Sequence, residues 1–395
     1  MNIKPEYDVI VVGAGPAGSI TAMTAARAGL NVLLIEKKQE RGEPVRCAEG
    51  LHREGMLEFI VPEDRMISSK ISKAIIHSPG GKSIEIKESE GNGPAGYILD
   101  RKIFDREMAR RAAAAGSDVH TKTQATEVII ENATVKGIKG VSMGKPFEAR
   151  SEILVGADGI ESNVGRWAGI NTTLKTADIA SCAQYLVSGI DIDQECCQFY
   201  PGNNIAPGGY LWIFPKGDCS ANIGLGIHMN AGARPAVYYL DQFMRDNFPD
   251  GKILQVTSGG VPIGGMPEKL SSSGLVLVGD AARLSDPLTG GGIYNAMVSG
   301  RIAAEVIISA IRDGDCSSKY LKRYDNAISM TIGKAYRQNI MLKDKLFSYS
   351  DRKLELLLSI FKRTKLSQME LSELYHIINN GDISMVKSLI LPFHK

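Results

Sequence analysis

The apolar positions of the chain fall into short continuous runs that predict buried strands. These runs are residues 9–12, 32–35, 153–155 and 275–278. Continuous apolar runs of this length are typical of strands buried on both faces of a parallel sheet. After the first and the last run, apolar residues recur every three or four positions, which predicts a helix ending near Gly29 and another beginning near Ile293. The pattern therefore predicts an α/β domain.

A second pattern, alternation of apolar and polar residues, fills the stretch from about residue 178 to 270. Alternation predicts an antiparallel sheet with one buried face. Shorter alternating segments occur within residues 75–86, a long helix is predicted from Arg101 to about residue 115, and residues from about 317 onward are mostly helical in pattern. We therefore expect an α/β (α+β) protein of two domains, in which the antiparallel sheet is inserted between parts of the first domain, with a helical C-terminal tail.

The first apolar run is followed by a glycine-rich turn that opens the first helix. The residues of this turn expected to bind a cofactor are Gly13, Gly15, Ala17 and Gly18. Gly13 permits a tight turn, Gly15 lets a pyrophosphate approach the backbone, and Gly18 lets helix and strand pack closely. The free N–H groups and the positive dipole end of the helix attract phosphate. Glu36 closes the next strand, where its carboxylate suits the ribose hydroxyls, so the segment predicts a dinucleotide site.

Two later strand–turn units indicate that the dinucleotide is FAD. Asp158 and Asp280 each follow an apolar run, and a nicotinamide dehydrogenase has no need of the later of these units. Asp280 is suited to hydrogen-bond the ribityl chain or the pyrophosphate, although a helix N-cap is the alternative role for an aspartate there. Gly291, Gly292 and the helix start at Ile293 are expected to bring backbone N–H groups to the isoalloxazine edge.

Composition narrows the class of protein further. The chain has 395 residues, 44% of them hydrophobic, and a formal net charge of +2, which predicts an enzyme with a large core and argues against a nucleic-acid partner. No signal-peptide pattern and no apolar run near the roughly 18 residues of a membrane span are visible. We therefore expect a cytoplasmic protein, or one peripheral on the cytoplasmic face of the membrane. The six cysteines lack zinc-site spacing, so no metal site is expected, and the sequence leaves disulfide formation open.

Two further segments connect the chain to a family. Residues 207–217 read PGGYLWIFPKG, and residues 43–51 read EPVRCAEGL. The first segment resembles the PxxYxWxFPKG signature of geranylgeranyl reductases, and the second resembles their cysteine-bearing flavin loop. The three FAD motifs are similar to those of flavoproteins of the para-hydroxybenzoate hydroxylase type. Over essentially its whole length the chain resembles the geranylgeranyl reductase family, and within it the archaeal digeranylgeranylglycerophospholipid reductases.

This resemblance and the alternation pattern together divide the chain into expected domains. The Rossmann-like FAD-binding domain takes residues 1–75, 99–177 and 271–316. The antiparallel substrate (catalytic) domain takes residues 76–98 and 178–270, and residues 317–395 form the helical C-terminal region.

The resemblance implies a function, which is the saturation of isolated double bonds in geranylgeranyl chains of archaeal membrane lipid precursors. Reduced flavin would supply a hydride from N5, and a group nearby would supply a proton. The resemblance implies a prenylated glycerophospholipid as substrate and NAD(P)H or a ferredoxin as reductant, a choice that the sequence leaves open. Two alternatives remain at this stage, a class A flavin monooxygenase (an aromatic hydroxylase) of the same fold and a flavin-bearing carrier protein without turnover.

The family resemblance also assigns roles to residues. Cys47 is expected to lie against the isoalloxazine, where it positions the ring or helps deliver the proton, or is merely a small residue that fits there. Tyr210 is the second catalytic candidate. Tyr210, Trp212, Phe214 and Pro215 are expected to line the prenyl chain, although alternation alone would make them ordinary strand residues. The residues expected to bind FAD are Gly13, Gly15, Ala17, Gly18, Glu36, Arg46, Cys47, Ala48, Gly50, Arg101, Ala125, Asp158, Asp280, Gly291, Gly292 and Ile293.

The tail carries a basic excess and an apolar stripe. Residues 331–395 contain eleven lysines and arginines against six acidic residues. Leu354, Leu357, Leu358 and Phe361 recur at helical spacing. Such a helix either lies on an anionic membrane or holds a headgroup phosphate, or it packs its stripe on the body of the protein, and the second arrangement is the more common one.

Overall fold

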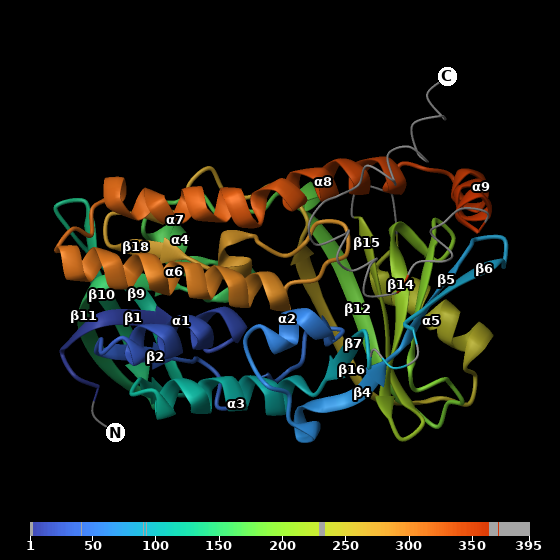
Figure 1. Cartoon of the computed structure of the whole chain (residues 1–395), viewed down its shortest axis with the longest axis horizontal. Coiled ribbons are helices and arrows are strands. Elements are labelled where there is room, and N and C mark those ends of the chain that lie inside the picture. The colour runs from blue at the N-terminus through green and yellow to red at the C-terminus, as the bar shows by residue number, and fades with distance from the viewer. Residues whose placement is uncertain are drawn as a thin grey trace.

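The computed structural model of the protein describes residues 3–40, 42–89, 91, 93–228, 234–362 and 370. Figure 1 shows two sheets next to each other along the long axis of the molecule. Across the top of this view run the helices α6 (Ile293–Asp313), α7 (Ser318–Thr331) and α8 (Gly333–Phe347). The predicted α/β class with an additional antiparallel sheet and C-terminal helices is confirmed.

The first sheet has eight strands and a parallel centre. Its strands in spatial order are β17 (Ser271–Ser272), β18 (Leu275–Leu277), β11 (Lys145–Gly156), β1 (Glu6–Val12), β2 (Val32–Ile35) and β8 (Asp118–His120), with β10 (Thr134–Ser142) paired to β11 and β9 (Thr123–Glu131) paired to β10. Strands β18, β11, β1, β2 and β8 pair in parallel. The predicted apolar runs fall on β1, β2, β11 and β18, the last of which ends one residue before its run does. Because their carboxyl ends share one edge of the sheet, the turns that follow them meet there.

Helices cover the parallel centre. In Figure 1, α1 (Pro16–Arg27) lies between α3 (Arg101–Ala114) and α6 and contacts both of them, and α7 lies beyond α6. The aspartate before α3, Asp100, accepts hydrogen bonds from the backbone N–H groups of Lys102 and Ile103 at 3.0 and 3.1 Å, which explains why the helix begins there.

The second sheet has seven strands and is almost wholly antiparallel. Its strands in spatial order are β16 (Lys252–Pro262), β12 (Ile179–Ser188), β15 (Ser220–His228), β14 (Ala206–Gly217), β13 (Cys196–Gly202), β5 (Lys73–His77) and β6 (Ser83–Lys87). Helix α5 (Ala236–Asn247) packs on one face, where Leu211 and Ile213 of β14 join its Leu240 in a buried cluster. Residues of the opposite parity on β14 therefore face the other way.

A small third sheet lies between the two. It contains β3 (Gly50–His52), β7 (Gly96–Leu99) and β4 (Ile67–Ile71), with α2 (Arg53–Leu57) and the 3₁₀ turn η1 (Asp64–Met66) beside it. Strand β5 begins at Lys73, before the domain limit predicted at residue 76, and β7 pairs with β3 and β4 rather than with the seven-stranded sheet. The domain limits drawn from the sequence remain a proposal.

The remaining short helical elements lie in connections near the edge where the strands end. They are η2 (Gly159–Glu161), α4 (Asn163–Trp167), η3 (Thr176–Asp178) and η5 (Gly279–Ala282).

Within the described residues, the last helix of the C-terminal region is α9 (Asp351–Phe361), which follows α8. Leu357 and Leu358 of its apolar stripe are 4% and 7% exposed, so the stripe packs on the body of the protein. Residues 363–369 and 371–395 of the predicted helical tail lie outside the described residues. Among the helices that are described, none combines the length and the apolar character that crossing a bilayer requires.

Candidate functional site

One large cavity, of about 990 Å³, runs from the first glycine turn to the apolar stripe of α9. Of the residues predicted to bind cofactor or substrate, all except Gly18 and Pro215 line it. The three strand–turn units, the loop of residues 43–51 (the Cys47 loop) and β14 therefore lie around one cavity, although they are far apart in the sequence.

The glycine turn before α1 leaves space at the helix N-terminus. Gly13 has φ +109°, and a Cβ there would lie 2.2 Å from the carbonyl oxygen of Ala157. A Cβ on Gly15 would meet nothing within 4 Å, so that side of the turn is open. Glu36 accepts hydrogen bonds from the backbone N–H groups of Ala14 and Lys38 at 3.1 and 2.9 Å, which fixes its carboxylate beside the turn. This open, positively polarised helix end suits a pyrophosphate.

Gly18 allows α1 to pack closely on the end of β1, and it does not line the cavity. A Cβ on it would lie 1.9 Å from the carbonyl oxygen of Gly13, so only glycine lets α1 approach the strand end this closely. The prediction that Gly18 allows close helix–strand packing agrees with this contact, but Gly18 itself does not border the cavity.

Two aspartates face the cavity from the later turns. The Oδ2 atom of Asp158 accepts a hydrogen bond from the backbone N–H of Val164 at 3.1 Å, whereas its buried Oδ1 atom has no partner among the described residues. Burial raises the pKa of both Asp158 and Asp280, and the charge of Arg101 opposes that rise at Asp280. An unsatisfied buried carboxylate oxygen facing a cavity fits a ligand that donates hydrogen bonds, as the hydroxyls of a ribityl chain do.

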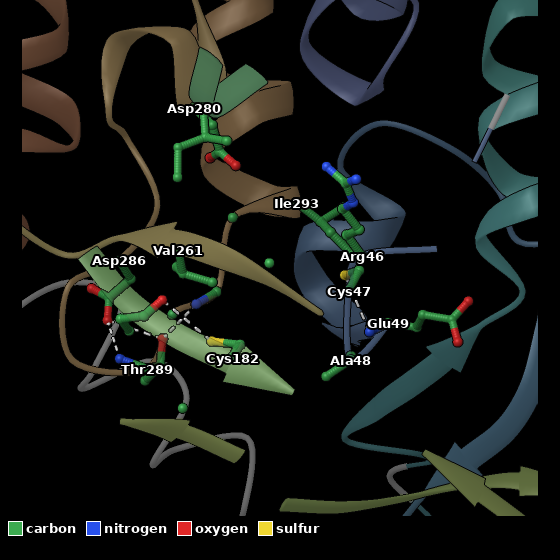
Figure 2. Close-up of a pocket in the computed structure, with 18 of the residues that line it drawn as sticks. Arg46, Cys47, Ala48, Glu49, Cys182, Val261, Asp280, Asp286, Thr289 and Ile293 are labelled. Atoms are coloured by element: carbon green, nitrogen blue, oxygen red, sulfur yellow. Dashed lines mark hydrogen bonds between the residues drawn. The ribbon is translucent and has the colours of Figure 1, made fainter. Parts of the chain in front are cut away.

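Asp286 braces the loop that leads to Gly291 and Gly292, a role that the sequence did not reveal. Its Oδ1 atom accepts hydrogen bonds from the backbone N–H and the hydroxyl of Thr289 at 2.8 and 2.9 Å, and its Oδ2 atom accepts one from the amide of Asn339 on α8 at 2.5 Å. Figure 2 shows the bonds between Asp286 and Thr289. The dipeptide Asp286-Pro287 ahead of a glycine run is a turn signal that could have pointed to this brace.

The Cys47 loop faces the aspartates from the other side of the cavity (Figure 2). The Sγ atom of Cys47 accepts a hydrogen bond from the backbone N–H of Glu49 at 3.2 Å. Burial raises the pKa of the Cys47 thiol, and the nearby Arg101 only partly opposes that rise, so the thiol is neutral near pH 7. A neutral thiol can donate a proton, although weakly.

The other predicted FAD contacts surround this loop. Arg101 forms a two-pronged ion pair with Asp105, with both N···O distances at 2.9 Å. Arg46 lies against β16, since a Cβ on Gly259 would be 3.7 Å from its Cδ atom. Ala48, Gly50 and Ala125 line the cavity through backbone or small side chains.

Strand β14 presents the aromatic wall. Tyr210, Trp212 and Phe214 line the cavity, and the hydroxyl of Tyr210 donates a hydrogen bond to the carbonyl oxygen of Thr289. Burial raises the pKa of Tyr210, which keeps its hydroxyl protonated. Pro215 was expected in this wall, and it is buried outside the cavity. It has the parity of Ile213, and successive strand residues point to opposite faces.

Beyond the aromatic wall the cavity is lined mainly by apolar side chains over a long stretch. These side chains come from four elements: Ile71 of β4, Ala74 and Ile76 of β5, Cys197 and Phe199 of β13, and Leu354, Leu357, Leu358 and Phe361 of α9. Burial of apolar surface is the main source of affinity that such a wall offers, so this end suits a long hydrocarbon.

Comparisons with known proteins define the class first. A family model described as FAD binding domain matches residues 6–204, and one described as geranylgeranyl reductase catalytic domain matches residues 178–261. With the cavity described above, these matches define a flavoprotein oxidoreductase whose cofactor is FAD. The residues that line the cavity near the glycine turn, including Gly15, Glu36 and Asp158, fit that cofactor.

Full-length relatives define the family. The digeranylgeranylglycerophospholipid reductase of Methanocella arvoryzae is 50% identical, covering 98% of this chain and 99% of the relative. That of Methanosarcina acetivorans is 49% identical, covering 99% and 97%. The chain belongs to this family of digeranylgeranylglycerophospholipid reductases.

Solved structures agree with this assignment. The crystal structure of a geranylgeranyl bacteriochlorophyll reductase-like protein from Thermoplasma acidophilum has a TM-score of 0.90 and 38% identity, covering 97% of this chain and 99% of that one. The flavin-dependent brominase Bmp2, with a TM-score of 0.70 and 20% identity over 92% of each chain, shares the fold alone.

Proposed function

We propose that this enzyme saturates isolated double bonds in the geranylgeranyl chains of archaeal glycerophospholipid precursors. The observation that carries the proposal is the single cavity, in which residues suited to FAD continue without interruption into an apolar stretch between β13, β14 and α9. A prenyl chain lying in that stretch would end beside the Cys47 loop and the aromatic wall.

The chemistry requires the protein to orient an unpolarised alkene and to supply a proton. When bound and reduced, FAD supplies the hydride that one alkene carbon receives. The other carbon takes a proton, for which Cys47 and Tyr210 are the proposed donors or relays because both are neutral groups on the cavity wall. Tyr210, Trp212 and Phe214 hold the chain and exclude water. The residues proposed from the sequence to bind FAD keep that role, with Gly18 acting through packing.

The aromatic hydroxylase alternative is disfavoured by the cavity wall. Such an enzyme takes a polar aromatic substrate, whereas the side chains of β4, β5, β13 and α9 that line the stretch beyond Phe214 are apolar. The deciding experiment is anaerobic incubation with dithionite and a geranylgeranylated glycerophospholipid, followed by mass spectrometry. A gain of two hydrogens per alkene supports the proposal, and a product that forms only with dioxygen overturns it.

The electron donor is proposed to be NAD(P)H or a ferredoxin. Flavin bleaching under anaerobic conditions with each donor in turn separates the two, and a donor that leaves the flavin absorbance unchanged is excluded.

A lipid substrate also implies contact with the cytoplasmic face of the membrane. Arg352 and Lys353 are exposed on α9, and Lys362 is exposed directly after it, at the apolar end of the cavity. Sedimentation with phosphatidylglycerol vesicles should show binding at low salt and release at high salt. The substitution Arg352→Gln with Lys353→Gln should weaken that binding, and an absence of binding at low salt would remove the membrane contact from the proposal.

A further inference from the structure

Glu49 is a buried carboxylate tied to three separate elements. It is 3% exposed, and its Oε1 atom accepts a hydrogen bond from the backbone N–H of Arg101 at the start of α3, at 2.9 Å. Its Oε2 atom accepts one from the side-chain amide of Asn222 on β15 at 2.6 Å and pairs with the Nζ atom of Lys216 on β14 at 2.7 Å. The carboxylate thus joins the FAD-binding part of the chain to two strands of the second sheet.

Lys216 completes this cluster. Its side chain is 13% exposed, and its Nζ atom also donates a hydrogen bond to the carbonyl oxygen of Leu99 at 2.6 Å. A buried ion pair of this kind is costly to desolvate, and removal of one partner strands the other, so its geometry is strongly enforced.

The backbone of Glu49 makes the direct connection to Cys47. Glu49 has φ +74°, a left-handed conformation that side-chain-bearing residues rarely adopt. In this conformation its N–H donates to the Sγ atom of Cys47 at 3.2 Å, while its carbonyl oxygen accepts from the backbone N–H of Leu99 at 2.9 Å. Strain of this kind persists only where the surroundings enforce it, and the three contacts of the side chain do so.

We infer that Glu49 is a positioning residue, which holds the Cys47 thiol in the cavity through its own constrained backbone. The inference rests on the proposed function, because Cys47 is assigned its role there. Glu49 borders the cavity beside Cys47, but its carboxylate is engaged by Arg101, Lys216 and Asn222, so we assign its effect on the reacting region to the position of the Cys47 thiol. The contacts of Glu49 with Lys216 and Asn222 fix the distance between the Cys47 loop and the second sheet, and this distance determines the position of the Cys47 sulfur atom.

The substitution Glu49→Gln tests the inference, because it preserves shape while removing the charge that pairs with Lys216. Asn222→Ala is the milder second variant, should Glu49→Gln fail to fold. Glu127→Gln is the matched control, because Glu127 pairs with Lys139 at 3.2 Å on the surface and does not touch the Cys47 loop. The first readout is the rate of iodoacetamide alkylation of Cys47 in the FAD-loaded enzyme, measured by peptide mass spectrometry against Cys182 in the same cavity.

In Glu49→Gln and Asn222→Ala, Cys47 should be alkylated several times faster relative to Cys182, because the loop is released. Turnover of the prenyl substrate should fall by about 10- to 100-fold, as expected for a displaced reacting group. In a Cys47→Ser background, Glu49→Gln should change turnover less than about twofold, because both substitutions lower turnover through the loss of a correctly placed Cys47 thiol. Unchanged alkylation in both variants, or additive effects on turnover, would overturn the inference. If the wild-type enzyme fails to saturate prenyl chains, the proposed function fails instead, and the alkylation result still decides whether Glu49 positions Cys47.

Discussion

The indole N–H of Trp212 donates a hydrogen bond to the side-chain oxygen of Gln184 at 3.0 Å. The amide of Gln184 in turn donates to the carbonyl oxygen of Cys47 at 3.0 Å. The aromatic wall and the Cys47 loop are therefore linked through one glutamine on β12, which is 8% exposed. A substitution in the aromatic wall should consequently alter the position of the Cys47 loop.

Trp212→Phe should keep the apolar face of the wall and lose this link. Because the oxygen of Gln184 is left without its donor, we expect a loss of about 1 kcal/mol in the free energy of unfolding. Turnover should fall several-fold, while FAD content stays unchanged. Chemical denaturation, flavin absorbance and product analysis measure the three quantities.

Tyr200→Phe is the control for that substitution. The hydroxyl of Tyr200 donates to the side-chain oxygen of Gln198 at 3.0 Å, which is a similar bond between an aromatic donor and a glutamine. Neither residue lines the cavity. Tyr200→Phe should therefore reduce stability alone, and an equal loss of turnover in both variants would argue against a link to Cys47.

Cys47→Ser should keep FAD bound and slow alkene saturation. Serine preserves the size and the hydrogen bond from Glu49, but its hydroxyl has a much higher pKa than the thiol and donates a proton less readily. A lost proton-transfer group typically lowers turnover by about 10²-fold or more. The measurement is single-turnover oxidation of reduced enzyme by the prenyl substrate under anaerobic conditions.

Cys182→Ser is the matched control, because Cys182 lines the same cavity from β12 and burial raises the pKa of its thiol to about 12. It should retain most of the activity. If Cys47→Ser turns over at the wild-type rate with saturating reductant, Cys47 has no part in the chemistry.

The local patterns of the sequence predicted the parallel strands and the turns after them, because those signals lie within a few neighbouring residues. Tyr210, Trp212 and Phe214 were assigned to the prenyl chain from the family signature, and they line the cavity, whereas alternation along β14 would have excluded Pro215. The family signature was followed there in place of the parity.

The contacts that hold the site together could not be predicted in this way. Gln184 meets Cys47, and Asn339 meets Asp286, across long stretches of sequence, so no local pattern marks them. The buried side of α9 was a similar case, since a helix with an apolar stripe looks the same whether it covers a membrane or a cavity. Only the arrangement of β13, β14 and α9 shows that the stripe completes the cavity wall.

The carboxylate of Glu107 on α3 should make stability depend on acid pH. Hydrogen bonds from Arg110 and Arg111 lower its pKa from its ordinary value to about 2. A carboxylate with a depressed pKa stabilises the fold above its unfolded pKa of about 4.5, and this contribution is lost as the pH falls toward 2. With allowance for screening around the exposed arginines, we expect about 2 kcal/mol.

Glu107→Gln should therefore be less stable than wild type at pH 7, and the difference should shrink as the pH falls from 4.5 to 2. Denaturant unfolding at several pH values measures this. Glu131→Gln is the control, because Glu131 pairs with Arg150 at 2.8 Å with both side chains exposed, and it should show little effect at any pH. A difference for Glu107→Gln that stays constant with pH would contradict the assignment.

Alanine substitutions at Gly13 and Gly116 distinguish the effect of backbone strain from the effect of close packing at the cofactor turn. Gly13 lies in that turn, whereas Gly116 follows α3. Their φ angles are +109° and +108°, so alanine is similarly strained at either position. A Cβ on Gly116 would meet nothing within 4 Å, whereas one on Gly13 would lie 2.2 Å from the carbonyl oxygen of Ala157. Gly116→Ala should cost about 1–3 kcal/mol from backbone strain alone and leave FAD affinity unchanged. Gly13→Ala should cost more and lose FAD, because the turn and the Asp158 segment must separate. Thermal unfolding and flavin fluorescence titration measure the two effects, and equal FAD affinity in both variants would show that close packing at Gly13 does not shape the cofactor site.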